Sequence, residues 1–163
     1  MRTARQRTLR DGPPRAFPIA ASPTVVDGTV YVATTDGRVV AVSAADGTEQ
    51  WRAEIGGEIR TTPAVADGTV YVGTTGNSVV ALAASDGSER WQTDTGDTVT
   101  AAAAVADGTV YVGTDGGDAV ALAASDGTEQ WRFGTGAVVA SPAVADGSVY
   151  VASEDHTVTA VSA

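Results

Sequence analysis

Residues 63–91 read PAVADGTVYVGTTGNSVVALAASDGSERW, and this stretch decides the fold. It divides into four short extended segments, separated by the turn pairs Asp67-Gly68, Gly76-Asn77 and Asp86-Gly87. Such pairs adopt positive φ at little cost, which two-residue hairpins require. Consecutive segments are therefore expected to pair antiparallel.

The same pattern recurs through the chain about every forty residues. The only tryptophans, Trp51, Trp91 and Trp131, are forty residues apart, and all four tyrosines lie between two valines. A fixed period of this size indicates a repeat architecture. We expect a basic N-terminal segment at 1–18, either flexible or a closing strand, followed by repeats over 19–163. The repeats fall at approximately 22–61, 62–101, 102–140 and 141–163, and the last lacks its outer strand.

The inner segments of each repeat are apolar on both faces, as VYV and VVALAA show. A strand without a polar face must be buried on both sides. A single four-stranded unit cannot bury both of its faces, whereas units stacked face to face around an axis can. The sequence therefore predicts an all-β fold, a β-propeller built of four-stranded antiparallel blades of about forty residues.

Composition excludes several classes of protein. The 163 residues carry 20 acids against 10 basic residues, a formal charge of -10, and contain no cysteine. Disulfides and thiolate zinc sites are therefore excluded. No apolar run approaches the roughly 20 residues of a membrane span, and the acidic field disfavours nucleic acid as a partner.

The charge is unevenly placed. Residues 1–15 hold five arginines and one acid, whereas the other 148 residues carry a net -14. The basic head lacks the apolar core of a secretory signal, so no signal peptide is predicted, and a disordered start is favoured over a basic binding arm. The acidic surface, arginine without lysine and small aliphatic core resemble those of proteins from halophilic archaea, so stability should rise with salt.

Residues 41–51 read AVSAADGTEQW, and with their copies ending at Trp91 and Trp131 they resemble the tryptophan-docking motif of pyrrolo-quinoline quinone (PQQ)-like repeat propellers. That family includes quinoprotein dehydrogenases and the outer-membrane assembly lipoprotein BamB. The resemblance implies that each tryptophan locks its blade to the next. The matching positions are Ala41, Ala81, Ala121, Gly47, Gly87, Gly127, Trp51, Trp91 and Trp131. Two motif positions differ: its Asp is Ser43, Ala83 and Ala123, and its Thr is Asp46, Asp86 and Asp126.

Propellers of the family usually have seven or eight blades, and this chain holds fewer than four complete ones. Three arrangements stay open: a closed four-blade ring, an open half-ring, and two chains forming an eight-blade ring. An open half-ring exposes apolar faces, which soluble monomers rarely tolerate. The homodimer is therefore the favoured arrangement.

Resemblance also implies how a quinone would be held. Family enzymes use cationic side chains, a calcium ion on acidic and amide ligands, a stacking tryptophan, an Asp base and, in many members, a vicinal disulfide. This chain has no cysteine, and its tryptophans all occupy docking positions. No catalytic residue is assigned, and no cofactor is expected; PQQ with calcium follows from the resemblance alone.

Two places break the repeat and are candidate sites. Arg60 stands where another copy has Thr100, close to the axial opening of a propeller, and is a candidate cofactor or anion contact. Glu154, Asp155 and His156 are candidate metal ligands. A solvated arginine and an exposed turn are the favoured interpretations.

These observations favour a non-catalytic propeller that acts as a rigid platform for a protein or peptide partner, or another ligand. The alternative is a partial or divergent PQQ-dependent oxidoreductase, and a repeat without an evolved ligand is a third possibility. The missing cysteine pair and calcium cluster favour the platform. Resemblance places such propellers outside the cytoplasm or at the cell surface.

Overall fold

The computed structural model describes residues 18–136 and 139–162, which form fifteen β-strands and no helix. Consecutive strands pair antiparallel into four separate sheets, three of four strands and one of three. This confirms the predicted β-propeller blades, the fourth with three strands among the described residues. Accordingly, the described residues contain no helix long and apolar enough to cross a membrane.

The strands follow chain order within each blade. Blade 1 holds β1 (Thr24–Val26), β2 (Thr29–Ala33), β3 (Arg38–Ser43) and β4 (Glu49–Glu54), and blade 2 holds β5 (Ala64–Ala66), β6 (Thr69–Gly73), β7 (Ser78–Ala83) and β8 (Glu89–Asp94). Blade 3 holds β9 (Ala104–Ala106), β10 (Thr109–Gly113), β11 (Asp118–Ala123) and β12 (Glu129–Gly134). Blade 4 holds β13 (Ala143–Ala145), β14 (Ser148–Ala152) and β15 (Val158–Ser162).

The hairpin between β5 and β6 forms where the Asp-Gly pair predicts it. Asp67 and Gly68 have φ of 47° and 69°, and Ala66 pairs with Thr69 across the turn. Two successive positive φ values give a turn whose twist matches that of the flanking strands. Aspartate tolerates this conformation better than most residues, which explains why Asp-Gly recurs at this place in every blade.

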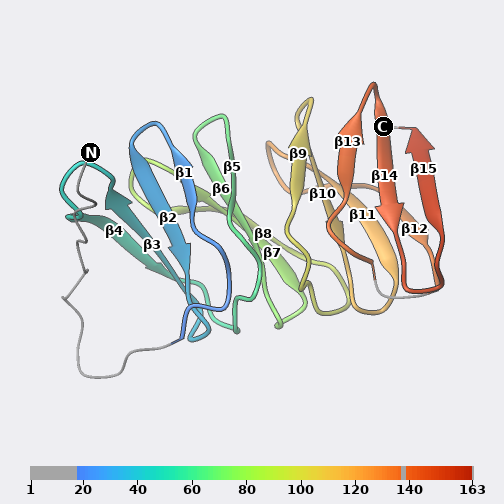
Figure 1. Cartoon of the computed structure of the whole chain (residues 1–163), viewed down its shortest axis with the longest axis horizontal. Helices are drawn as coiled ribbons and strands as arrows, with labels where there is room; N and C mark the ends of the chain where they lie inside the picture. The colour runs from blue at the N-terminus through green and yellow to red at the C-terminus, as the bar shows by residue number, and fades with distance from the viewer. Residues whose placement is uncertain (1–17, 137–138, 163) are drawn as a thin grey trace, which may run out of the picture.

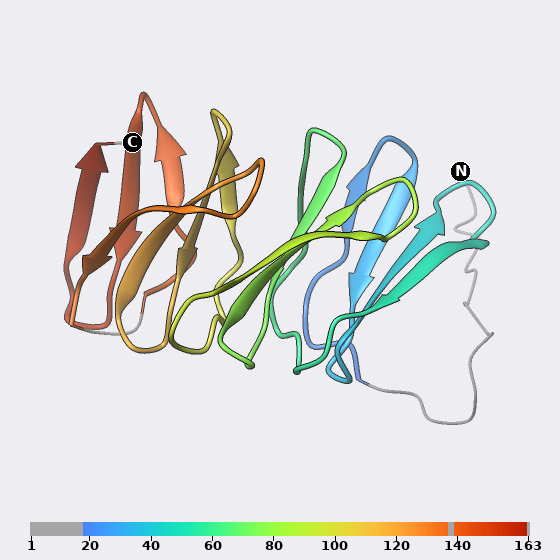
Figure 2. The ribbon, with the colours of Figure 1, turned by 180° about the vertical axis from the view of Figure 1, so that it is seen from behind.

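The four blades stand side by side in an open row (Figures 1 and 2). Their first strands contact in sequence, β1 with β5, β5 with β9, and β9 with β13. Blades 1 and 4 lie at opposite ends of the row in both views, so the described part of the chain does not close a four-blade ring. We call the face of a blade that looks toward the next blade in the chain its front face, and the opposite one its rear face.

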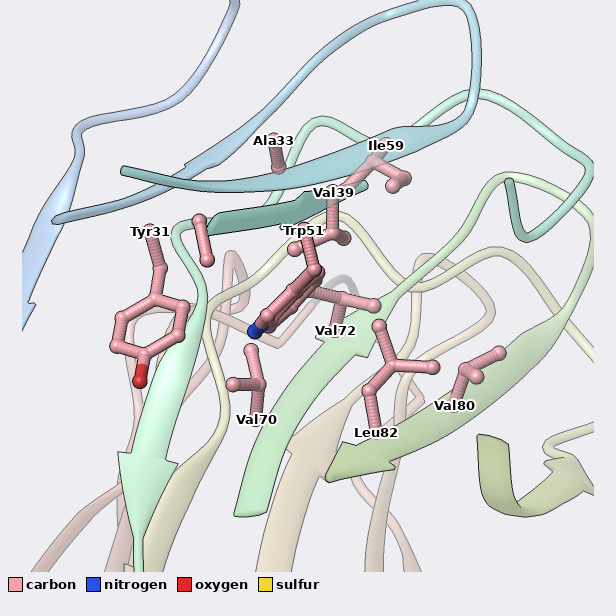
Figure 3. Packing of buried hydrophobic residues seen from close by; sticks show 10 residues of the cluster. Tyr31, Ala33, Val39, Trp51, Ile59, Val70, Val72, Val80 and Leu82 are labelled. Atoms are coloured by element: carbon pink, nitrogen blue, oxygen red, sulfur yellow. The ribbon is translucent and has the colours of Figure 1, made fainter. Parts of the chain in front are cut away.

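Three hydrophobic clusters fill the spaces between the blades. Figure 3 shows the first, in which Trp51 points from blade 1 toward Val70 and Val72 of blade 2. Front faces contribute tyrosine, tryptophan, small residues and, in blades 1 and 2, one valine, whereas rear faces contribute valine and leucine. The buried members are Tyr31, Ala33, Val39, Ala41 and Trp51 against Val70, Val72, Val80 and Leu82, with Ile59 from the linker. The core is therefore made by pairs of blades.

The described residues enter blade 1 through an irregular segment at 18–20. The carbonyl of Pro18 accepts hydrogen bonds from the backbone nitrogen and the hydroxyl of Thr35, at 3.2 and 3.1 Å. In blade 2 the carbonyl of Glu58 accepts the same backbone bond from Thr75. Pro18 thus lies where a linker from a preceding blade would run. The predicted closing strand falls almost wholly on residues 1–17, outside the described residues.

Candidate functional site

Each buried tryptophan lies against the blade that follows its own. The indole nitrogen of Trp51 donates a hydrogen bond to the carbonyl of Ala84 at 2.8 Å, and Trp91 repeats the contact with Ala124 at 3.0 Å. The ring rests on a glycine of the β7–β8 turn. A Cβ at Gly87, where φ is +74°, would lie only 2.5 Å from Cε3 of Trp51. The ring therefore fills space that only glycine leaves free.

Small residues also line the other side of each ring. Ala41 is the direct cross-strand partner of Trp51, as Ala81 is of Trp91 and Ala121 of Trp131. All three alanines are fully buried. A tyrosine of the same blade lies 5.8–6.0 Å from each indole in a tilted arrangement, which aromatic pairs favour. The motif residues thus meet at the interfaces between blades.

The aspartates that replace the motif's threonine belong to the turns. Asp46 accepts hydrogen bonds from the backbone nitrogen of Thr48 at 3.1 Å and from its hydroxyl at 2.8 Å. These bonds hold the pKa of the Asp46 carboxyl below its usual value, because they favour the ionised form. Asp86 and Asp126 repeat the arrangement and the direction of the pKa shift. Because the indole donates to a backbone carbonyl, its hydrogen bond requires neither motif side chain.

Arg60 lies on the linker between β4 and β5, and its side chain is more than half exposed. Its guanidinium forms an ion pair with Glu58, with Nε 3.1 Å from Oε1 and Nη2 3.2 Å from Oε2. An anion bound at Arg60 would have to displace this carboxylate. At the equivalent place in blade 3, the Thr100 hydroxyl donates to Asp115.

Glu154, Asp155 and His156 lie exposed in the turn between β14 and β15. Asp155 accepts hydrogen bonds from the Ser153 hydroxyl at 2.5 Å and from the Thr157 backbone at 3.0 Å, and these lower the pKa of its carboxyl. His156 has a φ of 68°, close to the 62° of Asn77 in the equivalent turn of blade 2. Across residues 18–136 and 139–162, no group of three or more acids, histidines or cysteines is placed to hold a metal ion.

The described residues do not fit the PQQ and calcium set that the resemblance implies. Trp51 and Trp91 are buried against the next blade and are not free to stack on a quinone. Arg60 is held by Glu58. We therefore derive no catalytic step through a quinone.

Arg132 makes a contact between blades that the sequence did not reveal. From β12 its Nη1 donates to the carbonyl of Thr95 at 2.8 Å, on the linker that leaves blade 2, and to Asp118 at 2.9 Å. Its Nη2 donates to Glu129 at 2.8 Å, and the two carboxylates raise the pKa of the guanidinium. A backbone carbonyl leaves no signature in the sequence, so only the fold identifies this partner.

Comparisons with known proteins agree with this architecture. The model of one protein family, described as outer membrane protein assembly factor BamB, matches residues 4–103 and 77–163. No curated protein matches the chain. The crystal structure of BamB from Moraxella catarrhalis is similar with a TM-score of 0.79 and 22% identity, over 88% of this chain and 46% of that one. This chain thus spans about half the length of that BamB.

Two further solved structures share the fold. The computationally designed Ika4 protein has a TM-score of 0.84 and 18% identity, over 95% of both chains. The quinohemoprotein alcohol dehydrogenase ADHIIG from Pseudomonas putida HK5 has a TM-score of 0.77 and 22% identity, over 90% of this chain and 32% of that one. At these identities the likeness concerns the fold.

Proposed function

We propose that this chain, which belongs to the BamB-type family of PQQ-like repeat β-propellers, is a non-catalytic platform that binds a protein or peptide partner. The blades supply a rigid frame, because apolar contacts fix each blade to the next. An indole hydrogen bond also joins blade 1 to blade 2 and blade 2 to blade 3. The description of the family model as an assembly factor supports a role in protein interaction.

The observation that carries this proposal is the burial of Trp51 and Trp91 against the next blade, which assigns the most distinctive side chains of the repeat to contacts between blades. The carboxyl groups of the turns agree with it. Among the described residues, the carboxyl groups of Asp46, Asp86, Asp126 and Asp155 have a lowered pKa. Each is exposed and is shifted by hydrogen bonds within its own turn. The pKa of a catalytic acid or base is instead shifted by burial and by charged groups that converge in a cleft. Asp46, Asp86 and Asp126 recur at the same turn of the repeat, and Asp155 lies in the turn between β14 and β15. We therefore assign all four to the turns.

The competing function is a PQQ-dependent oxidoreductase, and a cofactor titration separates the two. The full chain is titrated with PQQ and calcium in dilute and in molar salt while the absorbance of the cofactor is followed. The platform predicts no saturable change. Stoichiometric binding that the Arg60→Gln variant loses would overturn the proposal and assign Arg60 to a quinone site.

We place the platform outside the cytoplasm, on the support of the family description alone. Fractionation of the source cells, followed by detection of the chain with a specific antibody, tests this placement. Recovery with the periplasmic or cell-surface fraction is expected. Recovery with cytoplasmic marker enzymes would contradict it.

A further inference from the structure

The front face of blade 4 carries apolar side chains that no described blade covers. Tyr150 and Val158 are 41% and 71% exposed. Their counterparts on the front face of blade 2, Tyr71 and Val79, are 2% and 0% exposed. Within β14, Val149 and Val151 on the rear face are buried, whereas Tyr150 on the front face is not. Blade 4 is therefore packed on one side only.

The rear face of blade 1 shows the opposite half of the same interface. Val25 is 61% exposed, whereas Val65, its counterpart in blade 2, packs against the first core cluster. Val30, Val32 and Val40 are half-buried, whereas their counterparts Val70, Val72 and Val80 are fully buried. Val42 is the member of this face that stays buried. An apolar face this open on a soluble protein marks an interaction surface.

The three interfaces between the blades of this chain show what kind of surface covers such a face. At every interface between its blades, a front face with tyrosine and small residues meets a rear face of valines. The free front face of blade 4 and the free rear face of blade 1 are the two halves of this interface. They lie at opposite ends of the row, so the described residues of one copy do not bring the two faces together (Figure 1).

We infer that a second copy of this chain covers both faces, and that two copies close a ring of eight blades. Blade 4 of each copy docks its front face on the rear face of blade 1 in the other. Contacts between unlike faces close into rings when the rotation permits and otherwise grow into filaments. Two copies agree in size with the longer BamB, because this chain is similar to 46% of that one. The inference holds whether or not the platform binds another partner.

Charge decides the conditions in which the copies associate. Each chain carries a net charge of -10, so two copies repel each other in dilute buffer. The end faces themselves carry mainly valine, tyrosine and alanine. Arg38, at the start of β3, adds a charge to the rear face of blade 1 and is ion-paired with Asp36 and Glu54. At 1 M salt the screening length falls to about 3 Å, while apolar contacts are undiminished. The dissociation constant of the dimer should therefore fall as salt rises.

The test measures molar mass by light scattering and sedimentation equilibrium over a concentration series in 3 M KCl. We expect the 163-residue protein to have twice the 16.3 kDa of the chain. Val158→Asp and Val25→Asp each place a carboxylate in one face, and each should raise the dissociation constant at least about tenfold. Ser85→Asp is the matched control, because it adds the same charge to an exposed turn of blade 2.

Mixing the two variants tests which faces meet. A Val158→Asp chain keeps its rear face and a Val25→Asp chain keeps its front face, so the mixed pair forms one native interface of two. The mixture should associate more tightly than either variant alone. A wild type that stays at 16.3 kDa throughout, one that grows into open polymers, or a mixture without recovery would each overturn the inference. Because both residues are exposed, the variants should keep the circular dichroism of the wild type.

Discussion

Blades 2 and 4 carry nearly the same strands and have different surroundings. In both, a tyrosine lies between two valines on the second strand. All five residues of β6 are buried in blade 2, whereas in β14 of blade 4 buried and exposed positions alternate. The difference arises from the neighbours, because among the described residues blade 2 lies between two blades and blade 4 lies against one.

This contrast explains why the repeat is apolar on both faces. Each blade supplies half of two interfaces, so a strand that would elsewhere need one polar face needs none here. As a consequence, the end blades 1 and 4 each have one apolar face exposed among the described residues. A covered face should therefore contribute more to the free energy of unfolding than an uncovered one.

The largest difference is expected for the two tyrosines. Tyr71→Ala removes a buried ring that lies 5.8 Å from Trp91 and should cost about 4 kcal/mol of unfolding free energy. Tyr150→Ala removes a ring that is 41% exposed and should cost less than about 1 kcal/mol. Urea denaturation in high salt, at protein concentrations where the chain is single, measures both. Equal losses would show that blade 4 is covered within one chain.

Alanine substitutions at two glycines distinguish the packing of a tryptophan from backbone strain. Gly127 and Gly108 both have a φ of +74°. A Cβ at Gly127 would lie 2.5 Å from Cε3 of Trp91 and 2.4 Å from Oγ1 of Thr93, whereas at Gly108 it would meet nothing within 4 Å. Gly108→Ala should cost about 1 kcal/mol for its left-handed backbone, and Gly127→Ala about 3 kcal/mol. Thermal or urea unfolding of both variants compares them. Similar losses would mean that Trp91 does not need this glycine to dock.

Salt should stabilise the fold through the charged turns, because the inner strands carry little charge for it to screen. The described turns of every blade carry exposed aspartates, among them Asp27, Asp67, Asp107 and Asp146, while the inner strands are mostly neutral. Screening removes repulsion among these carboxylates, so the melting temperature should rise between 0.1 and about 3 M KCl. Scanning calorimetry at low protein concentration measures it. A flat melting temperature would refute the halophilic interpretation.

The smallest effect concerns pH and the turn carboxylates. Folding lowers the pKa of Asp46, Asp86 and Asp126. Their contribution to the stability of the fold is therefore fully present above the unfolded pKa of about 3.9. It is lost as the pH falls through the lower pKa values of the folded state. Carbon-13 NMR of the carboxyl groups follows this titration. Thr128→Ala should raise the pKa of Asp126 and leave that of Asp86 unchanged in the same spectrum. A joint movement of both would point to a global change of charge instead.

Much of this fold can be predicted from the sequence, because hairpin turns and apolar strands are local features. The Asp67-Gly68 turn and the antiparallel blade follow from the residues themselves. Backbone partners are different, since the carbonyls of Ala84 and Thr95 that receive Trp51 and Arg132 have no residue signature. The sequence also left the arrangement of the blades undecided. Tyr150 and Tyr71 have the same neighbours in sequence, and they differ only in what lies against them in the fold.

The most direct test of the end faces uses the absence of cysteine from the sequence. Val158→Cys, Val25→Cys and, as a control, Ser85→Cys each introduce one thiol, and its labelling rate is measured in 3 M KCl over a concentration series. If a second copy covers both faces, Cys at 158 and at 25 should become protected over the same concentration range while Cys at 85 stays reactive. If all three thiols react at the same rate at every concentration, the faces are free and the eight-blade ring is wrong.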